Sequence, residues 1–160
     1  MEEFEALAIS RGVLKIVKEV ARHLLRRPVV GVAAAARVPD GRWVLIRRTD
    51  TGEWALPGGT LEWGERLRTA IERELYEEAG VRVRDLGAIV GVYSDPARDE
   101  RFHAVTVVVQ ATVNLPERPP DNPAEIAAVG LFTSDELPPK LAHGMGDMLR
   151  HALSGETVWE

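Results

Sequence analysis

The stretch from Gly59 to Val81, GTLEWGERLRTAIERELYEEAGV, decides how the rest of the chain is interpreted. Its Leu, Ala, Arg and Glu content predicts a helix over residues 66–79, and Gly80 is suited to end it. At about 100° per residue, four apolar side chains form one stripe along this helix. They are Leu67, Ala70, Ile71 and Leu75. Such a stripe must face a protein core.

Three glutamates share that side of the predicted helix: Glu74 and Glu78 fall inside the stripe, and Glu77 lies on its edge. Carboxylates three and four residues apart repel one another, and burial favours their protonation. A divalent cation removes that cost, and hard oxygen ligands suit Mg²⁺, or Mn²⁺ as a substitute. The alternative is a structural network in which the glutamates pair with arginines. The candidates are Arg73, Arg66 and Arg47.

At every specified position the same stretch resembles the Nudix box, which reads Gly, five residues, Glu, seven residues, then Arg-Glu-apolar-any-Glu-Glu-any-Gly-apolar. The matching positions are Gly59, Glu65, Arg73, Glu74, Leu75, Glu77, Glu78, Gly80 and Val81. The resemblance implies a hydrolase that cleaves a nucleoside diphosphate linked to another moiety. It also implies that Mg²⁺ ions, held by Glu74, Glu77, Glu78 and the Gly59 carbonyl, activate a water for in-line attack at phosphorus.

The resemblance also suggests roles for residues around the metal ligands. The general base varies across the family between a box glutamate and a glutamate on a later loop, so Glu78 and Glu125 are both candidates. Glu125 equally suits an exposed charge at a strand edge. Arg73 and Glu65 are expected to orient the carboxylates by pairing. That pairing requires the loop before the helix to fold back, since eight helical residues span roughly 12 Å.

Length and charge limit the other possibilities. A chain of 160 residues is one domain able to bury a core. Its formal net charge of -5 argues against a nucleic-acid binder, and the absence of cysteine excludes disulfides and zinc thiolates. Glu2, Glu3 and Glu5 do not suit a secretion signal, and the apolar run at 29–36 is too short to span a bilayer. We therefore expect a cytoplasmic protein with no membrane partner.

Residues 1–27 predict an amphipathic helical extension, which leaves residues 28–160 for the hydrolase domain. Ser10 suits the N-cap, Pro28 ends the pattern, and apolar residues recur at helical spacing. These are Val13, Ile16, Val17, Val20, Ala21, Leu24 and Leu25. One stripe needs only one partner surface, so packing on its own domain is favoured. The alternative is an arm of a homodimer, or a flap over a neighbouring active site.

Five segments outside the box read as strands, and one reads as a closing helix. The strands are 28–38, 42–48, 81–93, 101–113 and 125–132, and the helix is 139–152. In the second strand Val44 and Ile46 share one side, while Trp43, Leu45 and Arg47 share the other. This order predicts an α+β layered fold. The Nudix resemblance implies a mixed β-sheet sandwiched between α-helices, with an extra N-terminal helix.

The region after the box, VYSDPARDERFHAVTVVVQAT, resembles that of archaeal and bacterial ADP-ribose pyrophosphatases, in which Ser-Asp-Pro and Arg-Asp lead into the next strand. Such enzymes yield AMP and ribose 5-phosphate. Where these relatives commonly read Pro-Arg-Gly-His, this chain has Glu-Arg-Phe-His at 100–103. Phe102 is a candidate for stacking on a base and His103 for a phosphate or ribose contact, but each also suits a strand core. Arg47 and Arg98 are candidates for diphosphate contacts.

Three functions remain open at this point. The first is Mg²⁺-dependent hydrolysis of ADP-ribose or a related nucleoside diphosphate sugar. The second is cleavage of modified nucleoside triphosphates to monophosphate and pyrophosphate, which would sanitise the nucleotide pool. The third is a non-catalytic, ligand-sensing domain. The complete set of carboxylates favours an enzyme over the third.

Overall fold

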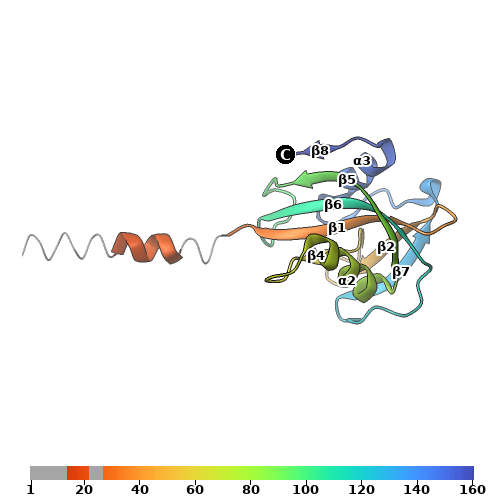
Figure 1. The fold of residues 1–160 in the computed structure, drawn as a ribbon, viewed down its shortest axis with the longest axis horizontal. Coiled ribbons are helices and arrows are strands. Elements are labelled where there is room, and N and C mark those ends of the chain that lie inside the picture. The colour runs from red at the N-terminus through yellow and green to blue at the C-terminus, as the bar shows by residue number, and fades with distance from the viewer. Residues whose placement is uncertain (1–13, 22–26) are drawn as a thin grey trace, which may run out of the picture.

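A computed structural model describes residues 14–21 and 27–160 of the chain. Within these residues, eight strands form one mixed sheet in the order β3-β2-β1-β6-β5-β8, with β4 paired to β1 and β7 paired to β2 (Figure 1). The strands are β1 (Val29–Arg37), β2 (Trp43–Arg48), β3 (Trp54–Ala55), β4 (Gly58–Thr60), β5 (Val83–Tyr93), β6 (Ala104–Val113), β7 (Ile126–Phe132) and β8 (Val158–Trp159). The helices are α2 (Leu67–Ala79) and α3 (Met145–Ser154), with short 3-10 helices η1 (Ser134–Glu136) and η2 (Ala142–Gly144).

Strand β1 positions the start of the box. One edge of β1 runs parallel to β6, and the other pairs antiparallel with β4. Strand β2 meets β1 at Arg37↔Trp43 and continues along β7 and β3. Because β2 pairs with β1 only at its end, the rest of this edge of β1 is free to pair with β4. In that pairing Val32 lies opposite Gly59.

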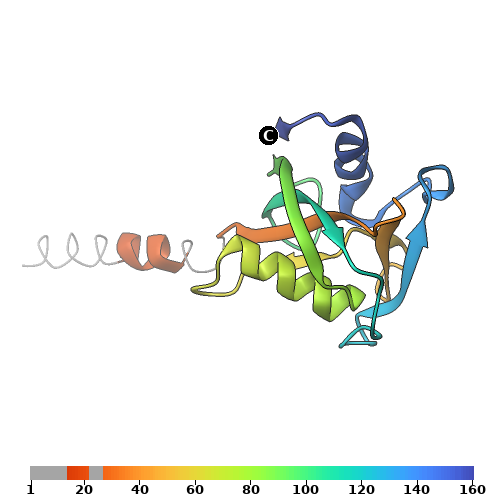
Figure 2. The same cartoon turned by 45° about the vertical axis from the view of Figure 1, so that its right-hand side comes forward.

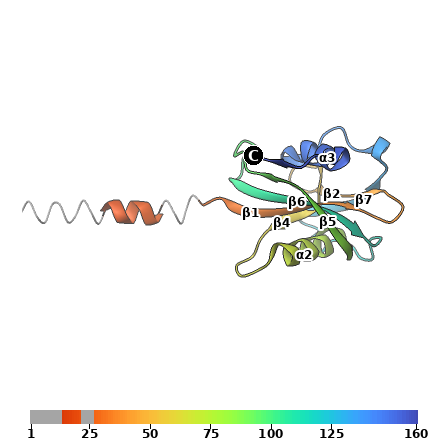
Figure 3. The same cartoon turned by 45° about the horizontal axis from the view of Figure 1, so that its top comes forward.

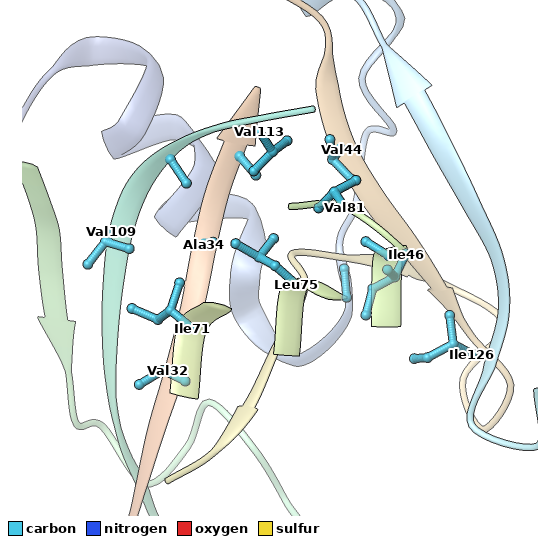
Figure 4. Packing of buried hydrophobic residues seen from close by; sticks show 14 of the residues in the cluster. Val32, Ala34, Val44, Ile46, Ile71, Leu75, Val81, Val109, Val113 and Ile126 are labelled. Atoms are coloured by element: carbon cyan, nitrogen blue, oxygen red, sulfur yellow. The ribbon is translucent and has the colours of Figure 1, made fainter. Parts of the chain in front are cut away.

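Two hydrophobic cores lie on opposite faces of the sheet. Helix α2 covers one face and α3 covers the other, and Figure 3 shows them on either side of the strands. The alternation predicted for the second strand is confirmed: Val44 and Ile46 belong to the α2 core, and Trp43 and Leu45 to the α3 core. Figure 4 shows the α2 side, where Leu75 points between β1 and β2. The expected sandwich of helix, mixed sheet and helix is thus confirmed.

Helix α2 agrees closely with its prediction. It ends at Ala79, and Gly80 follows in the left-handed conformation with φ 65°. The Gly80 N–H donates to the Tyr76 carbonyl, which satisfies part of the helix end. Ala70, Ile71 and Leu75 are buried as expected. Leu67, which stands at the first residue of the helix, is instead 40% exposed.

The closing helix begins later than predicted. The sequence pattern suggested a helix over 139–152, whereas α3 starts at Met145 after the separate turn η2. His143 and Gly144 adopt left-handed φ values of 52° and 65°, which an α-helix cannot contain. Leu141, Met148 and Leu149 are nevertheless buried in the α3 core. The short strands β3, β4 and β8 were also not predicted as strands.

The N-terminal prediction falls partly outside the described residues. Residues 14–21 are helical, and Figure 2 shows them apart from the sheet and its helices. Leu14, Ile16, Val17 and Val20 are each more than half exposed. The favoured interpretation, packing on its own domain, is therefore wrong for these residues, and the alternative, a dimerisation arm or a flap over a neighbouring active site, stays a prediction. Val13, Leu24 and Leu25 lie outside the described part. None of the helices described is long and apolar enough to cross a membrane.

The conformation of Gly80 gives a test of the fold. A Cβ at Gly80 would overlap the backbone carbonyl of Arg118, and φ there is left-handed. We expect Gly80→Ala to lower the free energy of unfolding by more than about 1 kcal/mol in urea denaturation. The matched control is Gly146→Ala, because nothing lies within 4 Å of that Cβ and alanine favours a helix by roughly 0.5–1 kcal/mol. Equal effects of the two substitutions would contradict this account.

Candidate active site

A cleft of about 430 Å³ lies where α2, β4 and the β5–β6 loop come together. Its wall on the box side includes Gly58, Gly59, Glu74 and Glu77. The other walls come from segments far apart in the sequence, including Arg48, Arg101, Phe102, Glu125, His143, Met145 and Met148. The fold thus gathers carboxylates, arginines and apolar side chains around one concave surface.

Glu78 is buried beneath β4. Its side chain is the only charged one buried in the part of the chain described, at 7% exposure. The Gly58 N–H donates to Glu78 Oε2 at 2.8 Å. Burial raises the pKa of Glu78 to about 8, and the nearby charges of Glu74 and Glu125 act in the same direction. The positive charge near Glu78 is therefore not sufficient to keep its carboxyl group ionised at neutral pH.

Glu74 lies against the backbone of Gly59. A Cβ at position 59 would overlap the Glu74 carboxyl group, so any other residue there would move this carboxyl group from its present position. Burial raises the pKa of Glu74, and the Arg73 guanidinium, with Nη1 at 2.8 Å from Oε1, partly opposes that effect. The first residue of the box and its central glutamate are thus in direct contact.

Arg73 holds the carboxylates together, as predicted. Its Nε and Nη2 donate to the two oxygens of Glu65 at 3.0 Å each, and Nη2 also donates to the Thr60 carbonyl at 3.1 Å. The loop before α2 therefore folds back toward the helix. Nη1 contacts Glu74 and, at 3.3 Å, Glu77. These bonds raise the pKa of Arg73, which stays charged.

The oxygen donors here are of the kind that a hard divalent cation prefers. Glu74, Glu77, Glu78 and the Gly59 backbone supply only oxygen, and burial leaves Glu78 without an adequate counter-charge. As the side chains stand, no three His, Cys, Asp or Glu groups of residues 14–21 and 27–160 converge on a metal position. The Glu74 carboxylate instead forms an ion pair with Arg73. A cation would therefore compete with Arg73 for this carboxylate.

Glu125 reaches the cleft from the start of β7. Its backbone carbonyl accepts a hydrogen bond from the Thr49 N–H at 2.8 Å, which ties this loop to the end of β2. Its side chain lines the cleft with Arg48, whose Nη1 is 3.7 Å from Glu125 Oε1. Arg48 also donates from Nε to Asp50 at 2.9 Å. Glu125 therefore lines the cleft, whereas Glu78 is not among the lining residues, although the charge of Glu125 acts on the Glu78 carboxyl group.

Two of the four residues predicted to contact substrate line the cleft, and two do not. Phe102 lines the cleft and is 39% exposed. Arg98 also lines it, but the Arg98 guanidinium is bound to Asp147, at 2.8 Å, and to Glu160. Arg47 and His103 are not among the lining residues. Arg47 lies over the Trp54 ring, and His103 Nε2 is 2.8 Å from the Ser94 carbonyl.

Sequence reasoning missed several cleft residues, among them Arg48, Arg101 and His143. Strand alternation could have identified the first, because Arg48 follows Val44 and Ile46 on the side facing α2. Arg101 is held by Asp99 at 2.7 Å and by Asp50 at 3.4 Å. No local pattern marks it or His143, since both positions depend on long-range packing.

Comparison with known proteins agrees with the geometry. Residues 26–152 match the family model of the NUDIX domain. The chain belongs to the Nudix family. A MutT-like protein of Streptomyces ambofaciens is 36% identical over 126 residues, which are 79% of this chain and 77% of that protein. An ADP-ribose pyrophosphatase of Methanocaldococcus jannaschii is 40% identical over 72 residues, 43% of this chain and 42% of its own length.

Solved structures of Nudix hydrolases share the fold. A MutT Nudix hydrolase from Burkholderia pseudomallei has a TM-score of 0.67 and 32% identity, with 79% of this chain and 98% of that one covered. An ADP-ribose pyrophosphatase from Streptococcus suis has a TM-score of 0.65 and 26% identity, with 84% of this chain and 100% of that one covered. The protein is a Nudix hydrolase, an enzyme acting on pyrophosphate bonds, and such hydrolases generally need a divalent metal.

Glu78 gives this Nudix site a measurable pH dependence. Its folded pKa of about 8 exceeds the ordinary 4.5, so the folded state keeps a proton that the unfolded state releases as pH rises between these values. Without metal, stability should therefore fall as pH rises through this window. We expect Glu78→Gln to exceed wild type in unfolding free energy at about pH 8, with the difference vanishing near pH 4.5.

The measurement is urea denaturation in a chelator across this pH range. Glu72→Gln, on the exposed side of α2, is the matched control for changing a glutamate of the same helix. A difference between Glu78→Gln and wild type that does not change with pH would contradict the assigned burial effect.

Proposed function

We propose that this Nudix hydrolase cleaves the diphosphate of ADP-ribose or a related nucleoside diphosphate sugar. The observation that carries the proposal is the cleft, which joins the box carboxylates to Phe102 and the methionines of α3. A substrate with a charged diphosphate and a flat base matches both parts. The similarity to the ADP-ribose pyrophosphatases of Methanocaldococcus jannaschii and Streptococcus suis supports it.

Mg²⁺, or Mn²⁺ in its place, would be held by Glu74, Glu77, Glu78 and the Gly59 carbonyl. When bound, the ion polarises phosphate oxygens and lowers the pKa of a coordinated water. In the reaction the water oxygen bonds to phosphorus, the bridging P–O bond breaks, and a glutamate accepts the proton. Glu125 and Glu78 are the two candidates for that glutamate. The products from ADP-ribose would be AMP and ribose 5-phosphate.

The chain's own ion pairs position these groups. Arg73 and Glu65 hold the first turns of α2 against the box loop, which keeps Glu74 beside Gly59. Arg48 and Arg101 face the same cleft, each paired with an aspartate that a diphosphate could replace. They support phosphate binding better than Arg47, which lies outside the lining, or Arg98, which is bound to Asp147.

A second candidate reaction is cleavage of a modified nucleoside triphosphate to a monophosphate and pyrophosphate. The MutT-like relative from Streptomyces ambofaciens and the MutT Nudix hydrolase structure from Burkholderia pseudomallei favour it. The same carboxylates would serve both reactions, so the products distinguish them. A purely ligand-sensing domain would not require this full set of carboxylates.

Product analysis decides between the two reactions. We expect purified protein with Mg²⁺ to convert ADP-ribose to AMP and ribose 5-phosphate, and to lose that activity in a chelator. A panel of ADP-ribose, nucleoside diphosphate sugars and modified nucleoside triphosphates, scored by chromatography, makes the comparison. Faster release of pyrophosphate from a triphosphate than of AMP from ADP-ribose would overturn the proposed substrate class.

Adjacent arginines supply a matched test of the diphosphate contact. Arg48→Ala should raise KM for ADP-ribose by about tenfold or more, since a hydrogen bond between charged groups contributes roughly 1.5–3 kcal/mol. Arg47→Ala is the control, because its side chain lies over Trp54 and not in the cleft. Steady-state kinetics with equal KM changes in the two variants would rule out the assignment to Arg48.

A further inference from the structure

His143 has an unusual backbone. Its φ of 52° and ψ of 36° are left-handed, and it is the only non-glycine residue with positive φ among those described. For a residue with a Cβ this conformation costs about 1–2 kcal/mol. Gly144 follows with φ 65°, so the chain takes two left-handed steps directly before α3. Such a cost suggests a role beyond folding when the residue also lies in a cleft.

The imidazole of His143 adds a second unfavourable contribution to the free energy of folding. Its Nε2 is buried and has no hydrogen-bond partner, which is true of no other side-chain nitrogen or oxygen buried in residues 14–21 and 27–160. Leaving a buried polar group unsatisfied costs about 1–3 kcal/mol. The whole side chain is 14% exposed and belongs to the lining of the cleft. Folding alone gains nothing from an unpartnered nitrogen at this place.

The surroundings of His143 define what Nε2 can bind. Nδ1 is 3.8 Å from Asp99 Oδ2, and this carboxylate favours the tautomer with the proton on Nδ1. Burial, with the charge of Arg101, lowers the pKa of His143, so the ring is neutral near pH 7. Nε2 then presents a lone pair. It can accept a hydrogen bond from a hydroxyl or amino group but cannot donate one to a phosphate oxygen.

The position in the cleft agrees with that chemistry. Met145, Met148 and Phe102 line the same cleft, and they offer apolar surface for a base or sugar. The phosphate-binding candidate Arg101 also pairs with Asp99, so His143 lies next to the part of the lining assigned to the diphosphate. Arg98 donates to the Gly144 carbonyl at 3.2 Å and pairs with Asp147 of α3, so it fixes the turn that carries His143.

We propose that His143 is a substrate-binding residue of this cleft, in which Nε2 accepts a hydrogen bond from a hydroxyl or amino group of the nucleoside. This inference rests on the proposed function and extends it to the recognition of the nucleoside. Because Nε2 is shielded from solvent, this contact requires the imidazole to turn toward the cleft as the nucleoside enters. The hydrogen bond formed there supplies the partner that Nε2 lacks in the free protein.

The test combines a variant with substrate analogues. His143→Asn suits the left-handed backbone and shortens the side chain, so it removes the contact without adding strain. Two analogues are compared with ADP-ribose: a deoxyribose form, which lacks a hydroxyl donor, and the hypoxanthine counterpart, which lacks the amino donor. For wild type, kcat/KM should be about tenfold lower with the analogue that lacks the donor bonded to Nε2. In His143→Asn, KM for ADP-ribose should rise about tenfold, kcat should be retained, and this discrimination should disappear.

His143→Gly is measured in parallel, because glycine accepts the left-handed backbone without cost and keeps the test decisive if the first variant folds poorly. Unchanged KM and unchanged discrimination in the folded variants, or a loss confined to kcat, would overturn the role of His143 while leaving the hydrolase proposal intact. Failure of wild type to cleave ADP-ribose at all would instead overturn the proposed function on which the inference rests.

Discussion

The buried carboxyl group of Glu78 is the constraint on which the rest of this structure depends. It lies between α2 and β4, with the Gly58 N–H as its hydrogen-bond donor and Glu74 close by against Gly59. To place these groups together, β4 must pair with β1, and α2 must turn its apolar side toward the sheet. Both requirements are met by residues of the box itself. The packing of α2 and the position of these glutamates are therefore set by the same short segment, whereas the other walls of the cleft come from distant segments.

The electrostatics of that segment are unbalanced without a cation. Arg73 binds Glu65 and Glu74 and touches Glu77, so it stabilises most of the acidic cluster. Glu78 forms no ion pair of this kind with any residue that the structure describes, and burial keeps its pKa high. A protein that needed only stability would gain from an apolar residue here. Retaining the carboxylate is understandable if a divalent ion and a phosphate complete the charge balance during the reaction.

Local patterns in the sequence were sufficient for the parts of the structure that depend on local physics. Helical periodicity and Gly80 predicted α2, and strand alternation separated Val44 and Ile46 from Trp43 and Leu45. Arg47 was named as a candidate for a diphosphate contact, but its neighbour Arg48 lines the cleft instead, because the cleft is formed by distant segments. Arg98 forms ion pairs with Asp147 of α3 and with Glu160, which follows β8. These residues are far from residue 98 in the sequence, so no short sequence pattern could have predicted the ion pairs. The spacing of apolar residues alone predicted a continuous helix over 139–152, but the left-handed turn at His143 delays its start to Met145.

The most direct test of the central claim is anomalous scattering from crystals of the protein grown with Mn²⁺, which shows the position of the bound ion. We predict a strong peak between the carboxylates of Glu74 and Glu78, beside the Gly59 carbonyl, with Arg73 moved away from Glu74. A peak elsewhere in the cleft, or Glu74 still bound to Arg73 with no ion beside Glu78, would contradict the account.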